Sequence, residues 1–233
     1  MPQSTFLADA TQFIDGVNPT FAPAGIWNLG VAYLGGSKSF VRRSLGSFNV
    51  FGAASPGRPL ASSDTVTAAE LVLQTASLIG PSGWPASIER ITRADWDYGS
   101  SDWTHYKTGA LWTVAGGDVA TPPSPVGLLS PAGGEQVIAG MLAFVTDAIA
   151  NRGGRVIIRI KADDEAPSQS QWCAYDASLS SPTRPRLRVT YTAADPTPIA
   201  HPTPPTIRGA SAARPADANS ATAPSRPSRA SPP

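Results

Sequence analysis

The sequence predicts a mainly β protein, a β-sandwich with one short helix, followed by an extended C-terminal tail. Several short runs alternate apolar and polar residues, which is the pattern of half-buried strands. One run spaces its apolar residues at helical intervals instead. Residues 193–233 contain no aromatic residue and consist mainly of Pro, Ala, Ser and Thr, so they lack the apolar side chains of a core.

The alternating runs give the expected strands in chain order: residues 26–33, 39–51, 65–74, 86–92, 154–161 and 186–191. Within residues 154–161, Val156, Ile158 and Ile160 share one face. The opposite face carries the basic side chains of Arg155, Arg159 and Lys161. Because clusters of Pro and Gly separate the runs, we expect half-buried strands joined by turns.

The expected helix covers residues 140–153, which end in two glycines suited to a helix C-terminus. Its apolar stripe consists of Met141, Phe144, Val145, Ala148 and Ile149. This stripe predicts that the helix packs one face against an edge of the sandwich.

The chain divides into a body, residues 1–192, and a tail, residues 193–233. The body is long enough for one well-buried core. The tail cannot bury enough apolar surface to offset its ordering entropy, so we expect it to be disordered unless an assembly binds it. In a polyproline conformation of ~3.1 Å per residue, it would reach on the order of 100 Å.

The charge pattern excludes some partners. The chain has a net charge of +1, and the tail has four arginines against two aspartates, so the body is slightly acidic. Nucleic acid binding needs a basic surface, so we expect no nucleic acid partner. No apolar run is long enough to span a membrane, and the first residues lack the pattern of a secretory signal. We therefore expect a soluble protein that is made in a cytoplasm, with no membrane partner.

Residues 93–118 concentrate five aromatic side chains among Asp, Gly, Ser and Thr, which favour turns: Trp96, Tyr98, Trp103, Tyr106 and Trp112. Because large aromatics bury most of their area in most folds, we expect a long connection fixed to the sandwich by its own tryptophans. The alternative is a sugar-binding surface, in which Trp103, Tyr106 and Trp112 stack against sugar rings and nearby acidic groups take the hydroxyls.

Several pieces of the body occur in a characteristic order: residues 6–9, 42–50, 66–73, 91–118, 144–149 and 184–191. This ordered set, within residues 4 to 192, resembles the DNRLRE (disaggregatase-related) domain family. The resemblance implies a jelly-roll-like antiparallel β-sandwich. The structural signature that it implies is Trp96, Trp103, Trp112, Asp118, Arg184 and Pro185. One departure is Asn49, where many members have Asp, which weakens any inference about an ion there.

Members of this family occur in bacterial and archaeal surface proteins, in polysaccharide-acting enzymes as accessory modules, and in phage virions. Together with the tail, the resemblance implies a non-enzymatic virion protein, a phage capsid decoration, capsid-associated or tail component. Its partners would be other virion proteins and further copies of itself. The alternative is a carbohydrate-binding or adhesive module whose partner is a host-surface glycan.

No catalytic set is expected. The two histidines, His105 and His201, stand in no nucleophile motif, and the lone Cys173 fits a small buried hydrophobe in a strand. Two acidic groups leave a calcium ion open as an alternative to the absence of any cofactor: residues 163–165, and the set Asp95, Asp97, Asp102 and Asp118. The second set departs from a calcium loop because Gly99 stands at the third ligand position.

Overall fold

The computed structural model describes residues 1–194 apart from 21–25, 35–36, 81–82, 121–126 and 130–131. The described residues belong to one compact unit, which ends just after the last strand. The expected tail and His201 therefore lie outside the described residues, except for Ala193 and Ala194, which follow the last strand.

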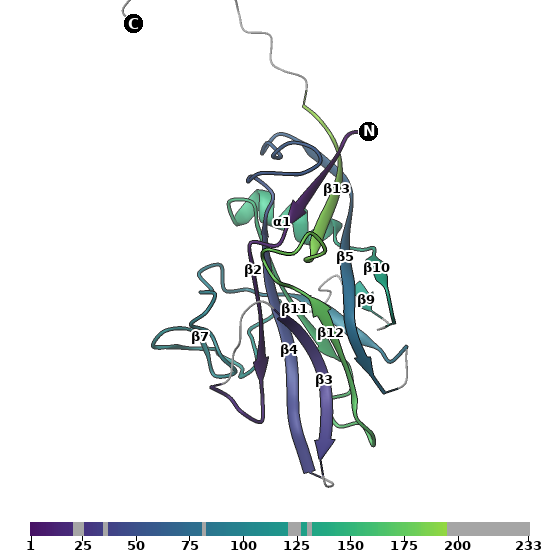
Figure 1. The fold of residues 1–233 in the computed structure, drawn as a ribbon. Coiled ribbons are helices and arrows are strands. Elements are labelled where there is room, and N and C mark those ends of the chain that lie inside the picture. Colours follow the sequence, from purple (N-terminus) through teal and green to yellow (C-terminus); the bar gives the residue numbers. More distant parts are fainter. Residues whose placement is uncertain (21–25, 35–36, 81–82, 121–126, 130–131, 195–233) are drawn as a thin grey trace, which may run out of the picture. The chain divides into compact units, whose positions relative to one another are not determined.

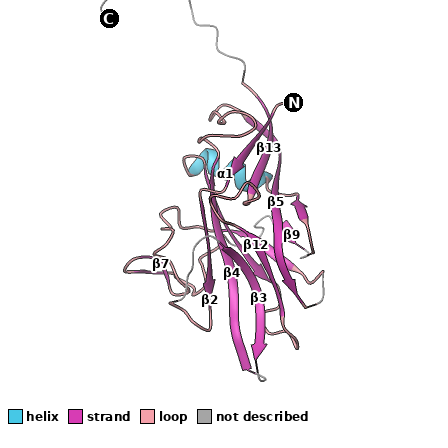
Figure 2. Ribbon diagram, in the orientation of Figure 1, coloured by secondary structure: helices cyan, strands magenta, loops and turns pink. Residues whose placement is uncertain are grey.

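Strands dominate the described chain, and one short helix accompanies them (Figure 2). The strands are β1 (Gln3–Leu7), β2 (Ala10–Asp15), β3 (Ile26–Leu34), β4 (Ser37–Asn49), β5 (Thr65–Ile79), β6 (Ala86–Arg90), β7 (His105–Lys107), β8 (Ala110–Leu111), β9 (Gly127–Leu129), β10 (Glu135–Ile138), β11 (Arg155–Ala162), β12 (Gln171–Asp176) and β13 (Arg186–Thr192). Among the described strands, every pairing is antiparallel. The predicted jelly-roll-like antiparallel sandwich with one helix is confirmed.

The two layers share the long strand β5 (Figure 1). In the first layer, β13 lies between β1 and residues 65–72 of β5, and β10 pairs with the other side of β5. In the second layer, residues 75–79 of β5 pair with β12, and the order continues through β3, β4, β11, β6 and β9. Strand β2 lies along the second half of β4.

The main core lies between the two layers. Phe6, Leu71 and Leu187 from the first layer belong to one cluster with Trp27 and Phe48 from the second, all at most 1% exposed. The indole Nε1 of Trp27 donates a hydrogen bond of 2.7 Å to the carbonyl of Leu45, so its only polar atom is satisfied. The alternation of apolar residues in β11 correctly predicted which of its faces enters this core.

Strand β11 departs from the expected half-buried pattern. Val156, Ile158 and Ile160 enter the main core as predicted, but Ile157 and Arg159 on the opposite face are also buried, at 1% and 5% exposure. A long loop covers that face. The alternation could not reveal this cover, because it reports which residues share a face and not what lies over the other face.

The helix α1 (Leu142–Asn151) is shorter than the predicted range but lies at the expected place. Phe144, Val145 and Ala148 are buried against the main core, as the apolar stripe predicted. The following Gly154 has φ +80°, and a Cβ there would lie 2.6 Å from the ring of Phe51, so glycine is required by both space and backbone.

Candidate functional site

The Trp-rich loop, residues 93–118, leaves the second layer after β6 and returns to the same place. A bridge between Ile91 and Val119 closes its base, and the amide of Thr92 donates to the carbonyl of Asp118 at 3.0 Å. The short hairpin of β7 and β8 lies within it. Because its ends meet, the loop is a closed unit that lies over the outer face of β2, β4 and β11.

Two tryptophans of this loop belong to a second hydrophobic core. Trp96 and Trp112 are 2% and 5% exposed. They pack with residues from three strands and from the base of the loop, namely Ala10, Ile14, Leu45, Ile91 and Ile157. The loop is therefore fixed to the sheet by burial of its own aromatic side chains.

A buried polar network lies beneath Trp96. Its Nε1 donates to Ser101 Oγ at 2.7 Å, and the side-chain amide of Gln12, on β2, donates to the same hydroxyl. The other end of Gln12 accepts a hydrogen bond of 2.9 Å from the amide of Gly99. Gln12 thus ties two points of the loop to β2, and each buried polar group has a partner.

Two arginines from the sheet hold the last residues of the loop, next to its base. Nη1 of Arg159 donates to the carbonyls of Gly116 and Gly117 at 2.8 and 2.7 Å, and Nη1 of Arg43 donates to the carbonyl of Gly116 at 2.9 Å. A Cβ on Gly116, whose φ is +84°, would lie 2.2 Å from Arg43 Nη1. The left-handed backbone of Gly116 therefore favours glycine, and a side chain there would displace the guanidinium of Arg43.

Each of these arginines is paired with a carboxylate. Nε of Arg159 donates to Glu89 at 2.8 Å, while Nε and Nη2 of Arg43 both donate to Glu165 at 2.7 Å. Burial lowers the pKa of Arg159, an effect that Glu89 opposes, and arginine stays charged at neutral pH. Burial alone would raise the pKa of Glu165, but its hydrogen bonds and attraction to Arg43 hold that pKa below its usual value.

Asp118 organises the last turn of the loop. Its carboxylate accepts hydrogen bonds from the amides of Thr113 and Val114, at 3.0 and 2.8 Å, and from Nε of Arg93 at 2.8 Å. Burial alone would raise the pKa of Asp118, yet these donors hold it below the ordinary value. Asp118 therefore acts as a turn-capping carboxylate with an internal counter-ion.

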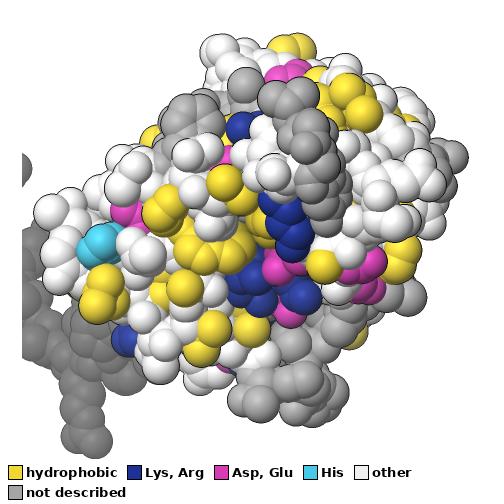
Figure 3. All heavy atoms as spheres, turned by 90° about the horizontal axis from the view of Figure 1, so that it is seen from below, with side chains coloured by type: hydrophobic (Ala, Val, Ile, Leu, Met, Phe, Trp, Pro, Cys, Tyr) yellow, Lys and Arg dark blue, Asp and Glu magenta, His cyan; other side chains and the backbone are white. Residues whose placement is uncertain are grey.

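A basic pocket of about 570 Å³ opens between the loop and the sheet. Four cationic side chains line it, those of Arg43, Arg93, Arg159 and Lys161, together with Asp118. On the face drawn in Figure 3, basic side chains gather beside acidic ones next to a hydrophobic patch. We refer to the pocket lined by these four cations and Asp118 as the basic pocket.

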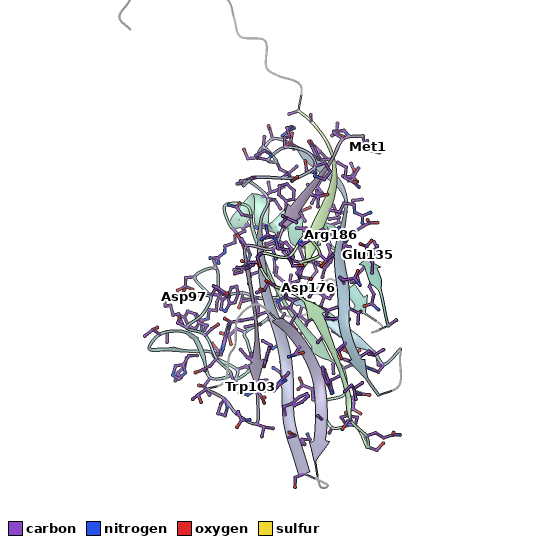
Figure 4. The ribbon with its side chains drawn as sticks, viewed as in Figure 1. Met1, Asp97, Trp103, Glu135, Asp176 and Arg186 are labelled. Carbon is purple, nitrogen blue, oxygen red and sulfur yellow. The ribbon has the colours of Figure 1, made fainter. Side chains whose placement is uncertain are left out.

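The three residues considered for sugar stacking have different environments. Trp112 is buried, whereas Trp103 and Tyr106 are half-buried. The guanidinium of Arg43 lies 4.4 Å from the centre of the Trp103 ring, at the end of the loop near β2 (Figure 4). Arg93 lies 4.8 Å from the centre of the Tyr106 ring. A sugar that stacked on this loop would therefore meet Trp103 or Tyr106, and would compete there with a cation.

The remaining signature residues lie elsewhere, just before β13. The carbonyl of Pro185 accepts a hydrogen bond of 2.9 Å from the amide of Ala8, and Nη1 of Arg184 donates to the carbonyl of Leu179. The first bond holds the turn between β1 and β2, and the second lies within the connection between β12 and β13. The signature residues thus form two separate groups rather than one site.

His105 does not form a catalytic triad. Its Nδ1 lies 2.8 Å from Thr104 Oγ1 and 3.1 Å from Asp102 Oδ1, so one ring nitrogen faces both groups. A triad needs one nitrogen for the nucleophile and the other for the orienting carboxylate. The Asp102 carboxylate also accepts the amides of Thr104 and His105, at 2.7 Å each, which is the geometry of a turn cap.

The acidic side chains considered for calcium already accept hydrogen bonds from other groups of the protein. Asp95 pairs with Lys107, Asp97 accepts from Ser100, and Asp163 accepts from Ser87. Within the part of the chain that the structure describes, no three His, Cys, Asp or Glu side chains are placed to share a metal ion. Cys173 is buried in β12, and burial raises the pKa of its thiol.

Sequence reasoning missed the two arginine and glutamate pairs that hold the loop. Arg159 was recognised as lying opposite the core face, but its partner Glu89 is 70 residues away on β6. The pairing becomes visible only with the sheet order, in which Glu89 lies directly opposite Arg159. The sequence did offer one indication of the ion pair: β11 carries a basic residue on its outer face, and β6 carries an acidic residue.

No protein-family model matches the chain, and no curated protein matches it at a significant level. The resemblance to the DNRLRE family stays a hypothesis. No helix among the described residues is long and apolar enough to cross a membrane.

Glu165→Gln is expected to reduce the acid sensitivity of the fold. A carboxylate whose pKa is lowered by folding contributes stability above its unfolded pKa of about 4.3, and this contribution is lost as the pH falls through the folded pKa. The variant should be less stable at neutral pH and lose less stability between neutral and acidic pH. Urea unfolding across this pH range measures both. The control Asp164→Asn removes an exposed acid that forms no ion pair among the described residues, and an equal pH dependence in both variants would contradict the assignment.

Proposed function

We propose that the chain is a non-enzymatic structural protein of a virion, a phage capsid decoration, capsid-associated or tail component. It would be made in a host cytoplasm and contact other virion proteins and further copies of itself. The burial of Trp96 and Trp112, at 2% and 5% exposure, carries this proposal. In the sequence, the tryptophans of the Trp-rich loop were the residues that most resembled a ligand site. In the structure they fix the loop to the sandwich, which suits a structural protein.

The composition of residues 193–233 supports the same proposal. A proline-rich segment with few apolar side chains gains little by folding on its own domain, but it can bind along the surface of a neighbouring subunit. Its four arginines are spread out, so the attraction to a partner would be distributed rather than concentrated at one point.

Trypsin digestion tests the assembly role of the tail. Arg208 and Arg229 precede Gly and Ala and are open to cleavage, whereas Arg214 and Arg226 precede proline and resist trypsin. We expect cleavage after Arg208 and Arg229 in the isolated protein and protection of both sites in purified particles, measured by mass spectrometry. The buried Arg159 is the internal control, since it should survive in both samples. Equal cleavage of the tail in both samples would contradict the proposal.

A second candidate function is a carbohydrate-binding or adhesive module. The observation that favours it is the basic pocket, which lies beside the half-buried Tyr106 because Arg93 contacts both. This candidate is compatible with a virion protein that presents the sandwich outward.

A further inference from the structure

We propose that the basic pocket binds an acidic sugar that carries one negative charge, a carboxylate or a sulfate ester, anchored by Lys161 and Arg93. This inference names the site and ligand class of the second candidate function, glycan binding, and rests on it. It is independent of the proposed role of the tail in assembly.

Strand register gathers the cations of the pocket. The pairing of Ile160 with Ser44 places Lys161 on β11 opposite Arg43 on β4, one residue further along. Arg159 lies two residues from Lys161 on the same face of β11. Like charges placed opposite each other on neighbouring strands repel, so this arrangement costs stability unless anions compensate it.

The internal carboxylates do not fully compensate these charges. Arg43 pairs with Glu165, Arg159 with Glu89 and Arg93 with Asp118. Lys161 is the fourth cation, and no hydrogen bond or ion pair joins it to a described residue; the Glu165 carboxylate attracts it, but this carboxylate is already paired with Arg43. Four cations and their three paired carboxylates therefore leave a net charge of +1 at the pocket. This balance favours a ligand with a single negative charge over a phosphate monoester, which carries close to two at neutral pH.

The pocket also offers free hydrogen-bond donors. A guanidinium has five N–H groups, and Arg93 uses Nε on Asp118 and Nη2 on Thr113. Nη1 of Arg93 makes no hydrogen bond to any described residue. The three N–H donors of Lys161 are also unused within the described chain. These donors suit an oxyanion, and the oxygen of the Thr92 hydroxyl, which itself donates to the carbonyl of Asp118, can accept from a neighbouring hydroxyl group.

The size and walls of the pocket favour a small sugar over a peptide. A volume of about 570 Å³ lies within the range of about 300 to 1,000 Å³ that is typical of small-molecule sites. The pocket lies on the outer face of β4 and β11, and both strands are paired on each side. It therefore has no free strand edge to which a peptide backbone could add.

Binding of small probes to the full chain tests this assignment. NMR titrations would compare methyl glucuronide and a sulfated glucose with neutral methyl glucoside, and with an acetylated tripeptide ending in a free carboxylate. We expect both acidic sugars to bind at least about tenfold more tightly than the neutral sugar, as for one charge-assisted hydrogen bond. Rising salt should weaken this preference.

Lys161→Gln is the decisive variant, since it removes the one lining cation that forms no ion pair with a described residue and leaves the three internal ion pairs in place. It should weaken binding of methyl glucuronide about tenfold. The matched control is Arg155→Gln, which removes the same charge from the same strand outside the pocket and should leave binding unchanged.

Other outcomes distinguish a failure of the acidic-sugar site from a failure of glycan binding in general. Equal binding of the neutral and acidic sugars, or an unchanged affinity in Lys161→Gln, would overturn the acidic-sugar site and leave glycan binding standing. Binding of the tripeptide as tight as that of the glucuronide would overturn the assignment to a sugar. If none of the sugars binds, the second candidate function falls together with the site.

Discussion

Replacing Trp96 by alanine is expected to lower the free energy of unfolding by about 3 to 5 kcal/mol, the range for a fully buried tryptophan. The substitution opens a cavity in the second core, between the Trp-rich loop and the sheet. It also removes one of the two donors to the buried Ser101 Oγ, the other being the Gln12 side-chain amide. Denaturant unfolding followed by circular dichroism measures the loss.

The matched control for this prediction is Leu111→Ala in the same loop. Leu111 is 64% exposed, so its removal should change stability by less than about 0.5 kcal/mol. If Trp96→Ala costs no more than Leu111→Ala, the loop does not unfold together with the sandwich. In that case the tryptophans would not serve the fold, and the argument from burial for a structural protein would fail.

Replacing Arg159 by methionine should cost about 3 to 5 kcal/mol, the loss typical of breaking a buried ion pair. Methionine keeps most of the apolar stem, so the loss isolates the guanidinium. Glu89 would be left with an uncompensated charge at 17% side-chain exposure, and the carbonyl of Gly117 would lose its donor. We expect the free energy of unfolding to fall accordingly in denaturant titrations.

The double variant Arg159→Met with Glu89→Gln tests the cause of this loss. Neutralising Glu89 removes the stranded charge, so the double variant should recover part of the stability lost in Arg159→Met. For comparison, Arg186→Gln breaks the more exposed pair with Glu135 (Figure 4) and should cost much less. A single variant as mild as Arg186→Gln, or a double variant without recovery, would contradict the role of Arg159 as a buried clamp.

The sequence could predict elements whose two faces differ in polarity. Strands β11 and β13 alternate clearly, and the apolar stripe of α1 correctly predicted its buried face. Strand β2 escaped prediction because all six of its residues are buried, including Thr11, Gln12 and Asp15. A strand covered on both faces, with polar residues satisfied by partners such as Ser101, shows no alternation.

The candidate site was harder to predict than the fold. The Trp-rich loop could be recognised from its composition, but the basic pocket beneath it could not. Arg43, Arg93 and Lys161 come from distant parts of the sequence and converge only through the pairing of β4 with β11 and the docking of the loop. The net charge of the pocket depends on the three carboxylates that pair with the arginines around Lys161. No local sequence pattern reveals these pairs.

The position of β13 gives the domain a direction-dependent mechanical strength. Because β13 lies between β1 and β5, a force that pulls on the chain after Thr192 against the body of the domain loads two hydrogen-bond ladders at once. A force between the two ends of the domain acts differently. Gln3 pairs with Thr190, so such a force opens the ladder of β1 and β13 from its end, one pair at a time. The domain should therefore hold a load that enters through its C-terminal strand better than one applied across both ends.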